Sequence, residues 1–261
     1  MLKRILFIGF WVVSILSVLA FEVYALKLSK KANCENLIVD IRQSKKYPAL
    51  TSSDEIRTKL LRNYPSIEGQ AISTIDLEEI EKKATVYNHV KDQGAFFYVN
   101  GNVGISGKMR KPIARIYNKV GQHFYLGEDT LVMPVSSSHS ARVIVANGNL
   151  PKLSSEYFTK AASETPKLPS IYKKIYILAS KIQNDVFLNA LIDQIYIVNH
   201  QEIELIPKTG ISTIILGDID DLDNKMKRLK IFYIKGKEKI NWNIYKSINL
   251  KYENQVVCTK K

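Results

Sequence analysis

The first pattern along the chain is an unbroken apolar run. Residues 5–26 are apolar at almost every position, and Glu22 is the one charged residue among them. As a helix this run is about 33 Å long, against about 30 Å of hydrocarbon in a bilayer. It exceeds the core of a cleaved signal peptide, about 7–15 residues, although Val18-Leu19-Ala20 resembles a cleavage site. The pattern predicts an uncleaved, single membrane anchor.

The two sides of this run carry similar numbers of cations, so the positive-inside rule does not decide how it is oriented in a membrane. Cations flank it on both sides: Lys3, Arg4, Lys27, Lys30 and Lys31. Long domains, however, cross a membrane largely regardless of charge. We therefore expect a cytoplasmic tail at residues 1–4, a juxtamembrane linker at residues 27–36, and the bulk of a single-pass membrane protein outside the cytoplasm.

From residue 37 to residue 117 the apolar period switches between that of strands and that of helices. Strands are expected at residues 37–41, 94–99 and 103–109, and helices at residues 51–63 and 73–87. The last two strands flank Asn100-Gly101, which is a strong hairpin signal. The order β-α-α-β-β predicts a three-stranded sheet with both helices on one face.

Both helices have N-terminal signals. Ser52 and Asp76 each stand three residues before a glutamate, which is the spacing of a capping box. Ile75 and Ile80 have the spacing of the hydrophobic staple that accompanies such a start. We expect Ser52 and Asp76 to accept hydrogen bonds from the first turn of each helix.

After residue 117 the strands become shorter and more frequent. Strands are expected at residues 123–127, 130–135, 141–148, 194–198, 202–207, 211–217 and 247–258, and helices at residues 170–183 and 220–235. The sequence therefore predicts an α+β fold in three parts: a transmembrane helix, the β-α-α-β-β module at residues 37–117, and a mixed, strand-rich β domain with two helices at residues 118–261.

A basic stretch broken by proline joins the module to the β domain. Proline has no amide hydrogen to donate, so Pro112 belongs at a strand start, an edge or a bulge. Arg110 and Arg115 flank it. We expect these three residues to form the hinge at which the last strand of the module passes into the second domain.

Composition narrows the functional classes only slightly. The chain of 261 residues is 46% apolar and 24% charged, which is ordinary for a globular protein. Its net charge of +13 favours anionic partners without choosing among nucleic acid, lipid headgroups and acidic proteins. With a membrane anchor in the same chain, nucleic acid is not expected as a partner.

No motif in the sequence points to catalysis. The glycines at residues 101–107 lie in a hairpin rather than in a phosphate-binding loop, the serines at residues 136–140 lack a nucleophile elbow, and the carboxylates at residues 218–223 begin a helix. Cys34 and Cys258 are too few for a metal cluster or a disulfide framework, and their pairing stays open. We expect no enzyme activity, no cofactor, no metal and no small-molecule substrate.

The last strand is the main candidate for a binding site. Ile248, Leu250 and Tyr252 alternate with polar residues, so the segment resembles a sheet edge that a partner strand extends. Tyr252 would be an aromatic anchor, Lys251 would pair with a partner carboxylate, and Val256 would add apolar contact. The alternative is that Tyr252 is a core residue.

Five stretches, taken in order, resemble the bacterial cell-division family FtsQ/DivIB. They are LTSSDEIRTKL, IDLEEIEKKATVYNHVKDQGAFFYVNGNVGI, MRKPIARIY, YLGEDTLVMPVSSSHSARVIVANG and INWNIYKSINLKYENQVVCTK. The resemblance implies a POTRA-like domain at residues 37–117 followed by the β domain. The chain departs from the family pattern at Gly107 and at Gly127-Glu128.

The resemblance also implies a function. Such proteins are non-enzymatic scaffolds of the division septum that bind FtsB- and FtsL-like proteins and link early and late division proteins to septal peptidoglycan synthesis. By this resemblance the final strand, with Lys251, Tyr252, Asn254 and Val256, binds the partner, and the stretch with Arg110, Pro112 and Arg115 contributes to recruitment. The alternatives are another POTRA-bearing export or assembly accessory protein, and a membrane-anchored envelope enzyme.

Overall fold

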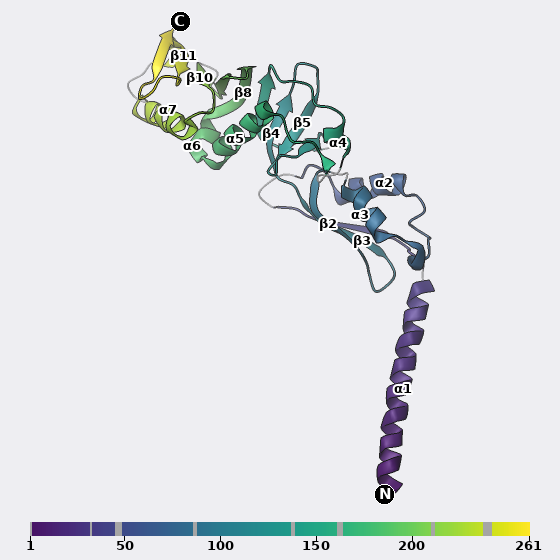
Figure 1. The fold of residues 1–261 in the computed structure, drawn as a ribbon. Helices are drawn as coiled ribbons and strands as arrows, with labels where there is room; N and C mark the ends of the chain where they lie inside the picture. The colour runs from purple at the N-terminus through teal and green to yellow at the C-terminus, as the bar shows by residue number, and fades with distance from the viewer. Residues whose placement is uncertain are drawn as a thin grey trace. The chain divides into compact units, whose positions relative to one another are not determined.

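The computed structural model describes residues 2–31, 33–44, 49–85, 88–136, 139–160, 164–209, 212–236 and 242–261. It contains helices and strand-rich sheets, which confirms the expected α+β class (Figure 1). Two compact units emerge from it. Unit 1 comprises residues 1–42, 52–84 and 92–108, and unit 2 comprises residues 43–51, 85–91 and 109–261. The domain boundaries expected from the sequence stay a prediction.

Unit 1 begins with the long helix α1 (Leu2–Lys31). Its described apolar side chains are exposed along much of its length, among them Phe10, Leu16 and Phe21 at 69%, 59% and 71%. In the part of the chain that the structure describes, no helix combines the length and the apolar character needed to cross a bilayer. A helix over residues 5–26 is thus confirmed, and the membrane anchor is not.

The remainder of unit 1 follows the expected β-α-α-β-β order. Its elements are β1 (Leu37–Arg42), α2 (Ser53–Asn63), the short 3₁₀ helix η1 (Ile72–Thr74), α3 (Leu77–Thr85), β2 (Val90–Phe97) and β3 (Val103–Met109). The sheet order is β1-β3-β2, with β1 parallel to β3 and Leu37 opposite Val103. Helix α2 packs against β1, and Arg57 Nε donates to Leu37 O at 2.9 Å.

The predicted helix starts are confirmed. Ser52 Oγ accepts from the amide of Glu55 at 3.1 Å. Asp76 Oδ1 accepts from the amides of Glu78 and Glu79 at 2.9 and 3.2 Å. Each bond satisfies a donor that the first turn of a helix leaves without a partner. Residues 75 and 80, the expected staple, are both buried isoleucines.

Unit 2 is built on a nine-stranded sheet whose order is β12-β11-β10-β9-β8-β7-β4-β5-β6. Its strands are β4 (Pro112–Tyr117), β5 (His123–Gly127), β6 (Val132–Pro134), β7 (Ile144–Gly148), β8 (Ile192–Asn199), β9 (Glu202–Pro207), β10 (Thr213–Gly217), β11 (Tyr245–Asn249) and β12 (Val257–Lys260). Neighbours β4–β7, β7–β8 and β10–β11 are parallel, and the other pairs are antiparallel.

Helices contribute the rest of the core of unit 2. They are α4 (Glu156–Thr159), α5 (Ser170–Asn184), α6 (Val186–Leu191) and α7 (Leu222–Gly236), with the 3₁₀ helix η3 (Trp242–Ile244). Helix α5 was expected at residues 170–183, and its residues at helical spacing form a buried apolar stripe: Ile171, Ile175, Leu178 and Ile182. Apolar burial of this kind stabilises the sheet roughly in proportion to the area removed from water.

Two predictions for the β domain are wrong. The described residues hold four α-helices there instead of two, because α4 and α6 are too short to show a helical period. The expected final strand at residues 247–258 is two antiparallel strands, β11 and β12, with a turn between them. Asn254 in that turn has φ +56°, a left-handed conformation that asparagine tolerates better than most residues.

Candidate protein-interaction site

The two ends of the nine-stranded sheet are β6 and β12, and they differ in what lies beside them. At the β6 edge, residues 88 and 89 cover the strand. Asn88 Nδ2 donates to Val132 O at 3.1 Å, and His89 Nε2 lies 2.7 Å from Pro134 O. Asn88 and His89 are only 1% and 5% exposed, so this edge is closed by buried side chains of the same unit.

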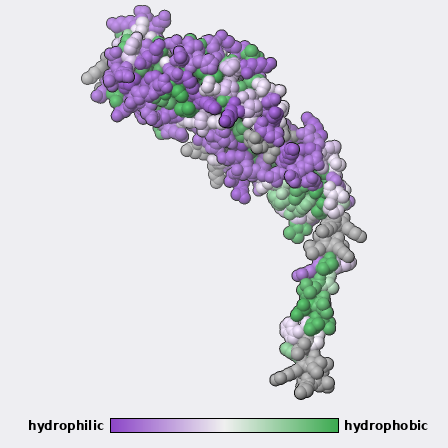
Figure 2. Space-filling view, in the orientation of Figure 1, coloured by the Kyte–Doolittle hydropathy of each residue, from purple (hydrophilic) through white to green (hydrophobic). Residues whose placement is uncertain are grey.

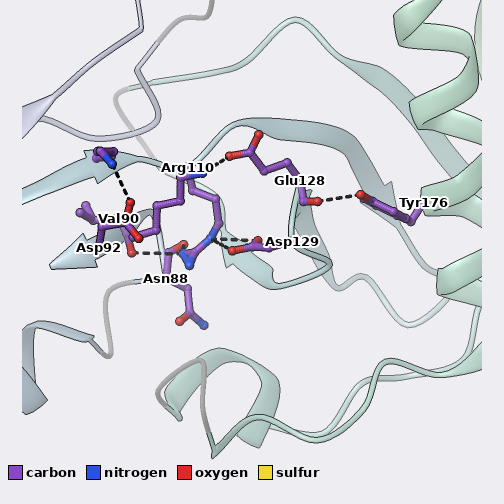
Figure 3. A network of polar contacts seen from close by, with 9 residues as sticks. Asn88, Val90, Asp92, Arg110, Glu128, Asp129 and Tyr176 are labelled. Carbon is purple, nitrogen blue, oxygen red and sulfur yellow. Dashed lines mark hydrogen bonds and ion pairs between the residues drawn. The ribbon is translucent and has the colours of Figure 1, made fainter.

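Arg110 holds this covering segment in place (Figure 3). Its Nη1 donates to Asn88 O at 2.7 Å and to Val90 O at 3.1 Å, and its backbone amide donates to His89 O at 2.8 Å. On the other side, Arg110 Nε donates to Asp129 Oδ2 at 2.8 Å. The side chain is 5% exposed, so a buried cation is satisfied by one carboxylate and two carbonyls.

The turn after β5 is shaped around this arginine. A Cβ atom on Gly127 would lie 2.8 Å from Arg110 Cδ and 3.0 Å from Asp129 Oδ1, so a side chain there would displace the guanidinium. The next residue, Glu128, forms an ion pair with Lys91 and accepts at its carbonyl from Tyr176 Oη at 2.7 Å. The Gly127-Glu128 departure from the family pattern therefore accompanies a buried arginine and its clamp.

The other two residues of the predicted hinge lie in β4. Pro112 begins β4 and is buried, which agrees with the expected strand start. Arg115 Nη1 donates to Ser140 Oγ at 3.1 Å, and its guanidinium carbon lies 5.1 and 5.4 Å from the ring centres of Tyr117 and Tyr125. A hinge or recruitment role for Arg110, Pro112 and Arg115 stays a prediction, and their contacts are those of structural residues.

At the opposite end, β12 pairs with β11 and has no further strand beside it in the described part of the chain. The amide of Lys261 donates to Ile244 O at 2.9 Å, which is on the β11 side. Amides alternate in direction along a strand, so those of Lys260 and Cys258 point to the outer side. Val257 is 38% exposed, and Thr259 and Lys260 are exposed. The β12 edge is open.

The four predicted partner-binding residues lie together in the turn between β11 and β12 rather than on a strand. Lys251 Nζ lies 3.5 Å from Glu202 Oε1, and its amide donates to Asn249 Oδ1 at 2.9 Å. Tyr252 is 50% exposed, so the alternative that it is a core residue is wrong. Asn254 is exposed, and Val256 packs partly against the core.

A groove of about 610 Å³ lies between this turn and α7. Its lining residues are Arg228, Ile231, Phe232, Lys235, Gly236, Asn254, Gln255 and Val256. Sequence reasoning missed the α7 side of the groove. Ile231 lies outside the buried stripe of α7 and is 43% exposed, and only the folded chain brings it beside the turn.

The charged side chains around the groove are mainly cations, and some of them form hydrogen bonds or ion pairs within the protein. Arg228 Nη2 donates to Leu250 O at 2.9 Å and so attaches α7 to the turn. Lys230 Nζ lies 2.6 Å from Asp185 Oδ2, and this bond, with the amides of Leu188 and Phe187, holds the pKa of the Asp185 carboxyl below its usual value. Lys235 and Arg228 leave the groove suited to a partner that carries carboxylates.

Chemistry other than binding has little support at this edge. Burial raises the pKa of the Cys258 thiol, so it is protonated at neutral pH and is a poor nucleophile. Cys34 and Cys258 are both free. Among the residues that the structure describes, no group of histidine, cysteine and carboxylate side chains is placed to hold a metal ion.

Comparison with known families adds one finding. A family model described as FtsQ/DivIB, C-terminal related, matches residues 111–259. The matched range runs from the residue before β4 to Thr259 and contains α7, the turn and all of β12 except Lys260. A comparison with curated proteins gave no match.

Proposed function

The chain belongs to the FtsQ/DivIB C-terminal related family, and from that premise we propose that it is a non-enzymatic scaffold of bacterial cell division. In this proposal unit 2 binds other division proteins of the FtsB and FtsL type. The scaffold thereby links early and late division proteins to septal peptidoglycan synthesis.

The observation that carries the proposal is the open β12 edge beside an apolar groove. An extended partner segment can add a strand to β12, where the amides of Cys258 and Lys260 point outward. Main-chain hydrogen bonds then supply affinity, and side-chain pockets supply specificity. The groove between α7 and residues 254–256 is such a pocket, and a helix preceding the partner strand would fit into it.

The predicted residues take defined roles in this arrangement. Tyr252, half exposed at the turn, is the aromatic anchor. Lys251 Nζ lies 3.5 Å from Glu202 Oε1 in the unbound protein. An exposed ion pair of this length is weak, so a partner carboxylate can compete for the cation. Val256 forms apolar contact in the groove, and Asn254 holds the turn in its left-handed conformation.

The location we propose rests on the sequence together with the exposure of α1. Apolar side chains such as Phe10, Leu16 and Phe21 face solvent around α1, and such a surface is stable when lipid covers it (Figure 2). We infer that α1 is an inner-membrane anchor with a cytoplasmic N-terminus, with the remainder of unit 1 and all of unit 2 in the periplasm at the division septum. Protease protection of the full chain in membrane vesicles of known orientation tests this topology.

A second candidate is a POTRA-bearing accessory protein of envelope export or assembly. The β1-α2-α3-β2-β3 order of unit 1 is compatible with it. Depletion of the protein separates the two candidates. Filamentous cells with blocked septa support the division scaffold, whereas outer-membrane assembly defects with normal septa would replace it with the second candidate.

Binding by the full chain tests the site. We expect Tyr252→Ala and Lys251→Glu to retain the circular dichroism spectrum of the unsubstituted protein and to weaken calorimetric binding of a purified FtsB–FtsL complex by at least about tenfold, which is about 1.4 kcal/mol. The control is Tyr196→Ala, since Tyr196 is 36% exposed on β8 within the same sheet. Folded variants that bind as tightly as the control would refute the proposed site.

A further inference from the structure

The β2–β3 hairpin of unit 1 ends in an apolar tip. Residues 94–99 carry no charge, and Phe96, Phe97 and Val99 are 36%, 38% and 106% exposed. Adjacent strand residues point to opposite faces, so Phe96 and Phe97 make both faces of the hairpin apolar. Figure 2 shows hydrophobic atoms gathered at this end of unit 1. Exposed apolar patches of this kind usually mark a contact surface.

The tip is held in one shape before it meets any partner. The amide of Tyr98 donates to Asn102 O at 2.8 Å, and the amide of Gly101 donates to Tyr98 O at 2.9 Å. The rings of Phe96 and Tyr98 meet edge to face with their centres 5.0 Å apart. A Cβ atom on Gly104 would lie 2.6 Å from Phe96 Cζ, so the missing side chain of Gly104 makes room for these rings.

The register of the sheet places this tip near the end of α1. β1 and β3 are parallel, with Leu37 opposite Val103, so the hairpin turn lies at the end of the sheet where β1 begins. The amide of Asn36 donates to Asn102 Oδ1 at 3.1 Å, and the amide of Val103 donates to Asn36 O at 3.3 Å. From Lys31, where α1 ends, to Asn36 the chain spans at most about 18 Å.

We propose that the hairpin tip, residues 96–99, rests in the headgroup region of the bilayer that holds α1, an inference that depends on the proposed location of α1. In this arrangement the tip is a second, peripheral contact that sets the height and tilt of the β1-α2-α3-β2-β3 part of unit 1 over the membrane. Aromatic side chains and tyrosine in particular favour this interfacial region. The cations that follow the apolar run in the sequence, Lys27, Lys30 and Lys31, favour a membrane with anionic headgroups.

A lipid surface fits the tip better than a protein strand does. Strand addition uses the backbone of a sheet edge and the side chains of one face. Here the exposed apolar residues lie on both faces and at the turn itself, with Val99 fully exposed at the point of the hairpin. A hairpin end that is apolar on both faces, with the exposed polar Asn100 in its turn, is suited to contact with the headgroup region, where apolar and polar groups meet.

Fluorophore labelling of the full chain in nanodiscs tests the inference. Val99→Cys, labelled with an environment-sensitive dye, is compared with Val120→Cys, because Val120 is an exposed valine (59%) in the β4–β5 turn of unit 2. Leu16→Cys reports on α1. The unsubstituted chain, with Cys34 buried and Cys258 partly buried, supplies the labelling background. The discs contain phosphatidylglycerol and lipids with a nitroxide quencher near the headgroup or deep in the acyl chain.

We expect the headgroup quencher to reduce the Val99 signal at least about twofold and to leave the Val120 signal unchanged. We expect the deep quencher to reduce the Leu16 signal. Quenching at Leu16 without quenching at Val99, or equal quenching at Val99 and Val120, would overturn the hairpin contact and leave the anchor standing. Absence of quenching at all three positions would overturn the anchor as well.

Discussion

The two edge strands of the nine-stranded sheet differ in whether other residues cover them. Beside β6, Asn88 and His89 bond to the strand carbonyls and are almost fully buried. Beside β12, the described part of the chain places no element, and outward amides adjoin an apolar groove. Proteins normally guard strand edges against unwanted pairing. The β6 edge follows that rule, so the open β12 edge is the place where a partner would be expected to pair.

The open edge is not wholly unguarded. Lys260 is exposed on β12, and a lysine on an edge strand hinders pairing between identical copies through repulsion of like charges. An acidic partner strand would experience the opposite effect. The difference between the edges therefore has two parts: the carbonyls of one edge are hydrogen-bonded to buried side chains, and the other edge is open and carries a cation, which in the proposed function favours an acidic partner.

Arg110→Ala should have the largest effect, because it removes the clamp of the closed edge. The carbonyls of Asn88 and Val90 lose a charged donor, and a buried side-chain volume is vacated. We expect the free energy of unfolding to fall by about 3 kcal/mol, measured by urea denaturation of the full chain. Asp129→Asn is the control and should cost less, because Asp129 is 37% exposed. A loss below about 1 kcal/mol for Arg110→Ala would contradict the clamp.

Lys260→Pro should damage the open edge and spare the fold. The outward amide of Lys260 is lost, whereas the ladder to β11 keeps its hydrogen bonds. We expect binding of an FtsB–FtsL complex to weaken about 30-fold, or about 2 kcal/mol, in calorimetry. Thr259→Pro, which removes an inward amide, should instead lower the melting temperature. Unchanged binding by folded Lys260→Pro would rule out strand addition at β12.

Asn88→Ala should open the closed edge locally. Val132 O loses its partner while Arg110 keeps its bonds to the backbone, so we expect a loss of about 1 kcal/mol in the free energy of unfolding. Hydrogen exchange should become faster at the amides of β6 and stay unchanged in β8. Equal protection of β6 in both proteins would mean that Asn88 fills space without guarding the edge.

The smallest effect on stability is expected at Asp185, which lies at the start of α6. It caps α6 and pairs with Lys230 of α7, and these bonds hold the pKa of its carboxyl below the usual 3.8. The stabilisation is complete above that value and is lost as the pH falls through the lowered pKa. We expect acid to destabilise the protein below about pH 4, and Asp185→Asn, which still caps, to flatten this dependence. Asp193→Asn, at an exposed position of β8, should leave the profile unchanged. If Asp185→Asn and the unsubstituted protein lose stability identically in acid, the Asp185–Lys230 ion pair does not contribute to the pH dependence.

What the sequence determined by itself were the features that depend on neighbours within a turn or two. The caps at Ser52 and Asp76, the Asn100-Gly101 hairpin and the buried stripe of α5 all follow from local spacing. A side chain three residues before a helix amide reaches that amide in almost any fold. The same holds for an apolar stripe, since helical geometry alone brings its members onto one face.

Only the tertiary structure decided the edges. Asn88 and His89 reach Val132 and Pro134 across more than forty positions, and nothing in their local sequence marks them as an edge cover. The split of the final segment into β11 and β12 was not visible in the sequence, because the alternation of Ile248, Leu250 and Tyr252 with polar residues does not reveal a turn. The burial of Arg110 and the groove beside Ile231 likewise depend on contacts between distant segments, which exist only after the chain has folded.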